Sequence, residues 1–262
     1  RANEYVQVGY EVFDRHNPID SDAEVFSVIK SALSGLGLRA ATGDIGILMA
    51  AVDGLQTTQA RKSALRRHIW HPRRFRALLD RYAGRTAVPA TRQALLAAAD
   101  PFAKAGPDIG LRSRAEIAAR IAALKSDAEA TPISKREVGL LDAILEVRET
   151  LPNALERLRD IAVDMPAIGP AVDRLARRMA ALERRGVDVA ALDFEASYGR
   201  TSMEYYDGFV FGFYAENRPD LPAVATGGRY DALTRVLGQG AEIPAVGGVV
   251  RPGLFLELGA GQ

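Results

Sequence analysis

The sequence of 262 residues contains no cysteine, so it can form neither a disulfide framework nor a zinc–thiolate site. It also lacks an apolar run of the roughly 18–20 residues that span a bilayer, and it shows no secretory signal. The formal net charge of +1 gives no overall attraction to nucleic acid or to an anionic membrane. We therefore expect a cytoplasmic protein without a membrane or nucleic-acid partner.

What is present is ordinary for a soluble globular protein, with 48% hydrophobic and 26% charged residues. The chain starts at Arg1, without an initiator methionine, inside an apparent strand. We therefore expect that an N-terminal portion of the natural protein is missing from it.

Residues 1–56 and 191–262 both mix strand and helix patterns. The first part predicts a strand over 5–13, a helix over 22–36, a strand over 38–44 and then a short helix. The last part predicts a strand over 209–213, a turn at 226–228, a helix over 230–237 and a strand over 243–250. Together these parts predict an α+β core.

Residues 57–190 are almost wholly helical in pattern. Two capping boxes, Ser113 with Glu116 and Ser134 with Glu137, precede helical runs of apolar residues. A further helix begins at Pro170 and is closed by Gly186. This stretch is therefore predicted to be a helical insertion.

The first strand has two different faces, because side chains alternate along a strand. Val6, Val8, Tyr10 and Val12 form one face, which we expect to be core. The other face carries Gln7 and Glu11 on either side of Gly9. The missing side chain at Gly9 leaves room for a small ligand with N–H groups, but the same face could simply meet water.

The strand that follows Tyr206 shows a similar pattern. Alternation places Tyr206 with Gly208, Val210 and Gly212, and it places Tyr205 with the phenylalanines 209, 211 and 213. A buried tyrosine needs a partner for its hydroxyl. Either a ligand or the core could supply that partner.

Four segments resemble the histidyl-tRNA synthetase branch of the class II aminoacyl-tRNA synthetases in order and spacing. They are residues 1–13 with 22–25, residues 205–211, residues 227–231 and residues 243–248. The resemblance implies a six-stranded antiparallel sheet flanked by helices, with histidine held above it. The helical stretch matches that family only in position.

The resemblance also assigns roles to particular residues. Gln7 would hold the amino group of histidine, Glu11 would accept from the imidazole, and Tyr206, paired with Tyr205, would complete the imidazole site. Tyr230 would line the same site. Arg200 stands five residues before Tyr205, whereas the synthetase's catalytic arginine stands four before, where Thr201 lies here. The predicted histidine-binding residues are Gln7, Glu11, Tyr205, Tyr206, Tyr230 and Arg200.

The third motif departs from the synthetase pattern. Leu254 occupies the position of the arginine that braces ATP, Arg251 lies three residues early, and Pro252 removes a backbone donor. The chain also stops about a dozen residues after that motif, so no anticodon-binding domain is expected.

This combination resembles the regulatory-subunit family of ATP phosphoribosyltransferase in histidine biosynthesis. The resemblance implies L-histidine as ligand and a short-form catalytic subunit as partner. It also implies a homodimer within a hetero-oligomer, and neither a catalytic residue nor a cofactor or metal in this chain.

Two other functions stay open at this point. One is a divergent or fragmentary histidyl-tRNA synthetase. The other is a synthetase paralogue in translational control or protein modification, for which the basic stretch 61–85 could contact RNA. That stretch equally suits a solvated helix face or an acidic partner surface. His68 and His71 lack a third metal ligand nearby.

Overall fold

The computed structural model describes residues 6–103, 105–107, 109–201 and 204–259. Its described strands form one seven-stranded sheet in the order β1-β7-β6-β5-β2-β4-β3. Neighbouring strands are antiparallel except β2 and β4, which are parallel. The α+β fold is confirmed, but the sheet has one strand more than the expected six. The strands are β1 (Val8–Phe13), β2 (Arg39–Asp44), β3 (Arg148–Thr150), β4 (Asp193–Glu195), β5 (Phe209–Tyr214), β6 (Ala225–Arg229) and β7 (Ala245–Val250).

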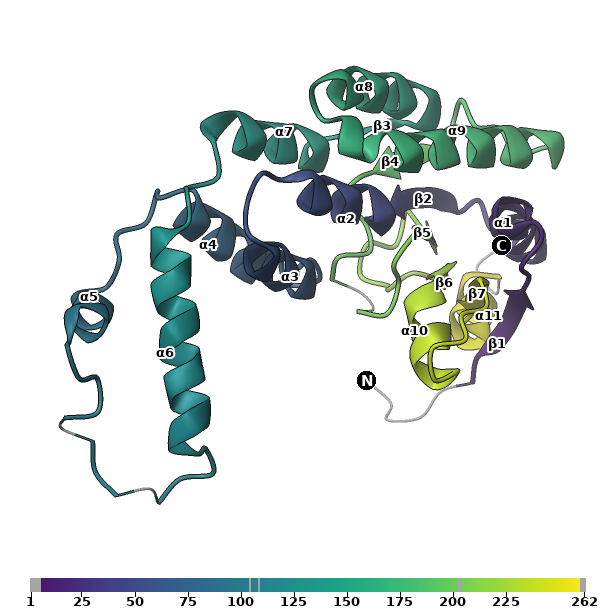
Figure 1. The fold of residues 1–262 in the computed structure, drawn as a ribbon. Coiled ribbons are helices and arrows are strands. Elements are labelled where there is room, and N and C mark those ends of the chain that lie inside the picture. Colours follow the sequence, from purple (N-terminus) through teal and green to yellow (C-terminus); the bar gives the residue numbers. More distant parts are fainter. Residues whose placement is uncertain (1–5, 104, 108, 202–203, 260–262) are drawn as a thin grey trace.

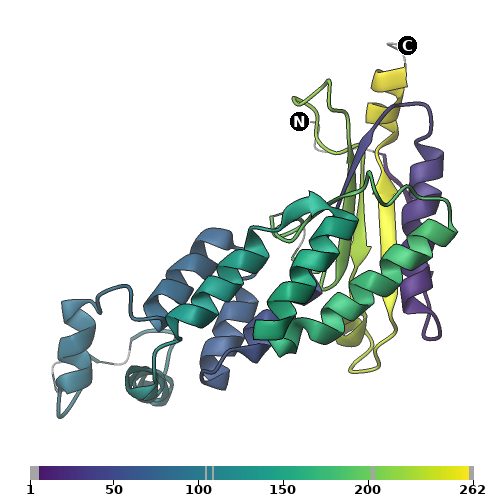
Figure 2. The ribbon, with the colours of Figure 1, turned by 90° about the horizontal axis from the view of Figure 1, so that it is seen from above.

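Helices flank this sheet and extend away from it. Figure 1 shows α7, α8 and α9 in a row beside the sheet, while α5 and α6 lie at the far end of the molecule. Figure 2 shows the same elongated arrangement from above. The helices are α1 (Pro18–Ala32), α2 (Ile45–Gly54), α3 (Gln59–Arg67), α4 (Pro72–Tyr82), α5 (Ala90–Ala97), α6 (Arg114–Glu129), α7 (Lys135–Leu145), α8 (Leu151–Asp164), α9 (Gly169–Arg184), α10 (Asp231–Leu237) and α11 (Pro252–Gly259).

The predicted capping boxes and the predicted end of α9 are confirmed, whereas the predicted start of α1 is not. Ser113 and Ser134 both form complete capping boxes, with Glu116 and Glu137 respectively. α9 has a proline in its first turn and is followed by Gly186, whose φ of 77° is the left-handed conformation that glycine adopts readily. α1 begins at Pro18, earlier than predicted, because proline suits the first turn of a helix.

One face of the sheet is covered by α1. Phe26 of α1 packs against the rings of Phe211 and Phe213, both at 5.3 Å between centroids, and of Phe209 at 6.3 Å. These alternate phenylalanines of β5 share the core face, as their period of two predicts. They form the apolar core between the sheet and α1.

The predicted turn at 226–228 is wrong, because these residues lie within β6. A Cβ on Gly227 would lie 2.3 Å from the Phe211 ring and 2.5 Å from the carbonyl oxygen of Gly247. The glycine is therefore required by close packing in the sheet and not by a turn.

The predicted core face of the first strand is also wrong in its outer half. Val6 is 74% exposed and Val8 is 59% exposed, and the Tyr10 hydroxyl donates to Glu24 at 2.6 Å. Only Val12 packs against the core. The reason is position, since β1 is an edge strand of the sheet.

The division into a core (1–56 and 191–262) and a helical insertion (57–190) stays a prediction. Within 57–190, β3 pairs with β4 of the sheet, and α9 packs against both α1 and α8. In the described part of the chain, every helix is too short or too polar to cross a membrane.

Candidate functional site

On the sheet face opposite α1, side chains are missing where glycines lie side by side on neighbouring strands. Glu11 of β1 stands opposite Gly247 of β7, and Gly247 stands opposite Gly228 of β6. A Cβ on Gly247 would lie 1.6 Å from Oε2 of Glu11, and a Cβ on Gly228 would lie 2.8 Å from Cδ1 of Tyr206. The two glycines therefore make room for the Glu11 carboxylate and the Tyr206 ring.

Glu11 and Tyr230 form the polar centre of this face. The Tyr230 hydroxyl donates to Oε2 of Glu11 at 2.5 Å. Burial raises the pKa of Tyr230, and the bond to Glu11 raises it further. The phenol therefore stays neutral at physiological pH and is available as a donor beside a carboxylate.

Tyr205 and Tyr206 lie together on the same side of the sheet. Their ring centroids are 4.7 Å apart, and the Tyr205 ring also meets Tyr230 edge-on at 6.0 Å. The prediction that they occupy opposite faces is wrong, because they precede β5 in irregular backbone where strand alternation does not apply. Gly208 also does not share a face with Tyr206 as predicted, since a Cβ on Gly208 would contact the Arg229 side chain.

Tyr206 is the more buried of the two, at 6% exposure against 40% for Tyr205. Burial raises the pKa of Tyr206, and the neighbouring Tyr205, Glu11 and Tyr230 raise it further. Its backbone carbonyl accepts from Nε1 of Trp70 at 3.2 Å. This bond connects the tyrosine pair to the segment between α3 and α4.

Gln7 and Arg200 are placed differently from these four residues. Gln7 is exposed and lies just before β1. Arg200 is buried, and its Nε donates to the carbonyl oxygen of Ile69 at 2.8 Å while its guanidinium lies over the Phe75 ring. The structure thus gathers Glu11, Tyr205, Tyr206 and Tyr230, whereas the Arg200 guanidinium is directed into the helices.

A small cavity of about 100 Å³ adjoins Tyr206. Oγ1 of Thr226 is buried without a hydrogen-bond partner among the described residues, and it belongs to the cavity wall. The sequence reasoning did not select this threonine, although its place directly before two strand glycines was a usable signal. The lining residues are Tyr198, Tyr206, Val210, Phe211, Thr226, Gly227 and Arg251.

Arg251 and Leu254, at the end of the predicted third motif, both have contacts within the fold. Nη1 of Arg251 donates to the carbonyl oxygen of Ala223 at 2.6 Å. Leu254 is half-buried and packs against the core. In this arrangement one side chain is engaged with the backbone and the other is apolar.

Asp207 connects the two segments that carry the tyrosines. Its carboxylate accepts from the backbone N–H groups of Asp231 at 3.1 Å and Ala232 at 2.7 Å. Burial raises the pKa of Asp207 to about 6. The segment of Tyr206 is thereby joined to the residues directly after Tyr230.

Several arginines of the basic stretch 61–85 form ion pairs within the fold. Arg61 is 6% exposed and pairs with Asp127 at 2.6 Å, and Arg76 pairs with Asp142. His71 lies 3.2 Å from Glu204, and its ring centroid is 6.2 Å from that of His68. Among the described residues there is no cluster of three histidine or acidic side chains that could hold a metal ion.

The fold, together with the sheet face that carries Gly228 and Gly247, is that of a class II synthetase-like domain. A solved ATP phosphoribosyltransferase regulatory subunit/histidyl-tRNA synthetase from Bacillus halodurans matches 96% of the chain with a TM-score of 0.60 at 20% identity. Histidyl-tRNA synthetase from Nostoc sp. matches 97% with a TM-score of 0.59 at 13% identity. The chain covers about half of each, 52% and 50% respectively.

The histidyl-tRNA synthetase family model matches residues 111–252, which is more than half of the chain. The chain therefore belongs to the histidyl-tRNA synthetase family. Among curated proteins it is similar to the ATP phosphoribosyltransferase regulatory subunit of Brucella anthropi, with 29% identity over 94% of the chain and 70% of that protein. The protein of the same name from Brucella canis is 28% identical over the same shares.

Proposed function

We propose that the protein is a regulatory subunit of ATP phosphoribosyltransferase in histidine biosynthesis and that it binds L-histidine. The observation that supports histidine as the ligand is the hydrogen bond of 2.5 Å between Tyr230 and Glu11, which lies above Gly247 and beside the buried Tyr206. A carboxylate accepts hydrogen bonds from N–H groups, and a neutral phenol can donate a hydrogen bond either to the carboxylate or to the ligand.

In this proposal Glu11 accepts from an imidazole N–H of histidine, while Tyr206 and Tyr230 line the ring. Tyr205 would cover the bound histidine from the solvent side, since it is 40% exposed and contacts both other tyrosines. Gln7 would bind the amino group from the exposed beginning of β1. Arg200 is engaged with Ile69, so we assign it to positioning the helices behind the tyrosine pair.

The chain itself would be non-catalytic. Arg251 is held on a backbone carbonyl and Leu254 is packed, which leaves neither in the role of the arginine that braces ATP in the synthetase. The chemistry would belong to a short-form catalytic subunit that assembles with a dimer of this chain. Histidine would favour one arrangement of the complex, and activity would follow that population.

Calorimetric titration of the chain with L-histidine, with ATP in parallel, tests the proposal. We expect histidine to bind and ATP not to bind. Glu11→Gln should lower histidine affinity roughly tenfold or more, the typical loss for one charge-assisted hydrogen bond. Glu156→Gln on α8 is the matched control, because Glu156 is exposed and its ion pair within the described part of the chain is with Arg159 of the same helix.

Two results would contradict this function. Equal histidine affinity in Glu11→Gln and the unsubstituted protein would place the ligand elsewhere. Histidine-dependent exchange between pyrophosphate and ATP would instead identify a synthetase.

A further inference from the structure

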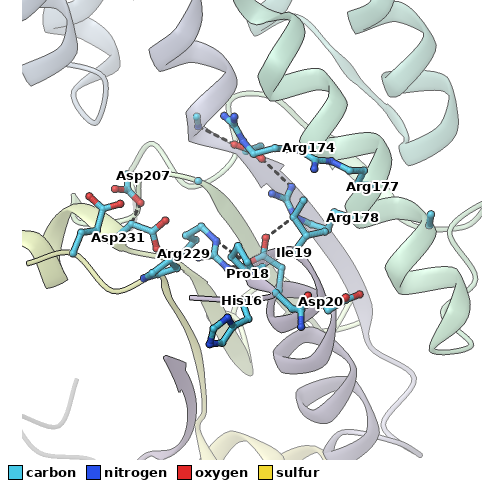
Figure 3. Close-up of a pocket in the computed structure, with 18 of the residues that line it drawn as sticks. His16, Pro18, Ile19, Asp20, Arg174, Arg177, Arg178, Asp207, Arg229 and Asp231 are labelled. Carbon is cyan, nitrogen blue, oxygen red and sulfur yellow. Dashed lines mark hydrogen bonds and ion pairs between the residues drawn. The ribbon is translucent and has the colours of Figure 1, made fainter. Parts of the chain in front are cut away.

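A second and larger cavity lies at the end of the sheet, on the side of α1 and α9. It has a volume of about 730 Å³, which is within the usual range for small-molecule sites. Its walls come from the start of α1, the start of α2, α9 and the segments around Asp207, Arg229 and Arg235. Figure 3 shows Arg174 and Arg177 extending from α9 on one side and Asp207 and Asp231 on the other.

The floor of this cavity is a buried network of ion pairs. Asp22, fully buried, accepts from Nε of Arg178 at 2.8 Å and from Nη2 of Arg229 at 2.6 Å. Arg178 also donates to Asp44 at 2.8 Å, and Arg229 also donates to Asp231 at 3.0 Å. Three carboxylates thus pair with two guanidinium groups, so the network carries a net charge of −1 and both of its arginines are paired within the protein.

The remaining acidic side chains of the wall are engaged as well. Asp20 pairs with Arg184 at 2.9 Å, and Glu242 pairs with Arg235. Asp207 accepts from two backbone N–H groups. Each carboxylate of the wall therefore already has a hydrogen-bond or ion-pair partner of its own.

Two wall cations lie outside these pairs. Arg174 and Arg177 form no ion pair with any side chain that the structure describes, and both are exposed on the cavity side of α9. They are three residues apart, so they project from the same helix face. Nη2 of Arg174 lies 3.7 Å from the Cβ position of Gly46, in the first turn of α2.

Backbone donors add to this positive charge. α1 has 15 residues and opens on the cavity with no side-chain cap from Asn17. The first N–H groups of a helix have no intrahelical partner, and the helix dipole favours an anion there. Pro18 contributes no donor, so Ile19 and Asp20 supply the first N–H groups that lack an intrahelical partner.

We propose that this cavity is a binding site for a phosphorylated small molecule, whose phosphate group is held by Arg174, Arg177 and the start of α1. Paired guanidinium groups match phosphate geometry through bidentate hydrogen bonds. The volume also accommodates a sugar or nucleoside attached to the phosphate. The site lies across the sheet from Glu11 and Tyr230, and it does not depend on the proposed histidine site.

The test is calorimetric titration of the whole chain with inorganic phosphate and with ribose 5-phosphate, using ribose as the uncharged probe, in chloride buffer at constant ionic strength. We expect both phosphate probes to bind and ribose not to bind. Arg174→Gln and Arg177→Gln should each weaken the binding of ribose 5-phosphate roughly tenfold. Arg120→Gln on α6 is the matched control, because it removes an exposed arginine far from the cavity.

Both substituted side chains are exposed, so thermal unfolding should stay within about 2–4 °C of the unsubstituted protein. Failure of ribose 5-phosphate to bind the unsubstituted chain would overturn the proposal. Equal affinity in Arg174→Gln, Arg177→Gln and Arg120→Gln would also overturn it, because the phosphate would then bind elsewhere.

Discussion

Asp22 joins three elements of the fold, so its removal is the most informative test of how the molecule is held together. It stands in α1 and is fully buried, and its two oxygens accept from Arg178 of α9 and Arg229 at the end of β6. Burial by itself lowers the pKa of both arginines, but their acidic partners outweigh this and raise it. Asp22→Ala would leave two buried guanidinium groups with one carboxylate each.

The magnitude follows from what stays behind. Removing one partner of a buried ion pair costs about 3–5 kcal/mol when the charge left behind has no other partner. Here Arg178 keeps Asp44 at 2.8 Å and Arg229 keeps Asp231 at 3.0 Å. We therefore expect a loss near the lower end, about 3 kcal/mol, which lowers Tm by roughly 6–12 °C in a chain of this size.

Thermal unfolding followed by circular dichroism measures this effect. The control is Asp160→Ala, since Asp160 is an exposed residue of α8 and its removal should change stability by less than about 0.5 kcal/mol. A similar Tm for Asp22→Ala and Asp160→Ala would refute the reasoning. It would show that the arginines find new partners or water once Asp22 is gone.

Three further predictions concern single residues. Gly247→Ala should weaken histidine binding at least roughly tenfold in calorimetry, because the new Cβ would lie 1.6 Å from the Glu11 carboxylate and displace it. Gly139→Ala should stabilise the protein by about 0.5–1 kcal/mol in urea unfolding, because Gly139 is exposed in the middle of α7 and its Cβ would meet nothing within 4 Å. Asp207→Asn should change the dependence of stability on pH. The pKa of Asp207 is raised to about 6 in the fold, so stability from its neutral form is complete below the unfolded value of about 3.9 and is lost as pH rises through 6. The asparagine variant, measured by urea unfolding against the unsubstituted protein, should therefore gain relative stability between pH 4 and pH 7.

Each of these has a result that counts against it. Unchanged histidine affinity in Gly247→Ala would mean that Glu11 is not part of the site. A destabilised Gly139→Ala would show that α7 is strained there or contacts a partner. A constant stability difference between Asp207→Asn and the unsubstituted protein from pH 4 to pH 7 would mean that Asp207 has an ordinary pKa.

Local signals in the sequence were reliable where the local chain decides the conformation. Ser113 with Glu116 predicts a helix start because both bonds of the capping box form within four residues. The alternate phenylalanines of β5 predict one apolar face because side chains alternate between the two faces of a strand. The failures fall where alternation was extended beyond a strand, as at Tyr205, or where neighbours in space decide burial, as at Val8.

The glycines also differ in whether local backbone conformation or neighbours in space decide their role. Gly186 could be recognised as a helix end, because its role is set by its own backbone conformation. Gly227 was mistaken for a turn residue, because its role is set by Phe211 on the next strand, which is close in space but distant in sequence.

The sequence by itself determined the α+β class, the position of most helices and strands, and the candidate residues Glu11, Tyr205, Tyr206 and Tyr230, because periodicity, caps and motif order are written along the chain. Only the tertiary structure decided which of the candidates meet, since Glu11 and Tyr230 are 219 residues apart and become neighbours through β7 and β6. It alone revealed the network of Asp22, Arg178 and Arg229 and, beside it, Arg174 and Arg177, which form no ion pair with a described residue. Coulombic pairing depends on distance in space, and no pattern of adjacent residues encodes that distance.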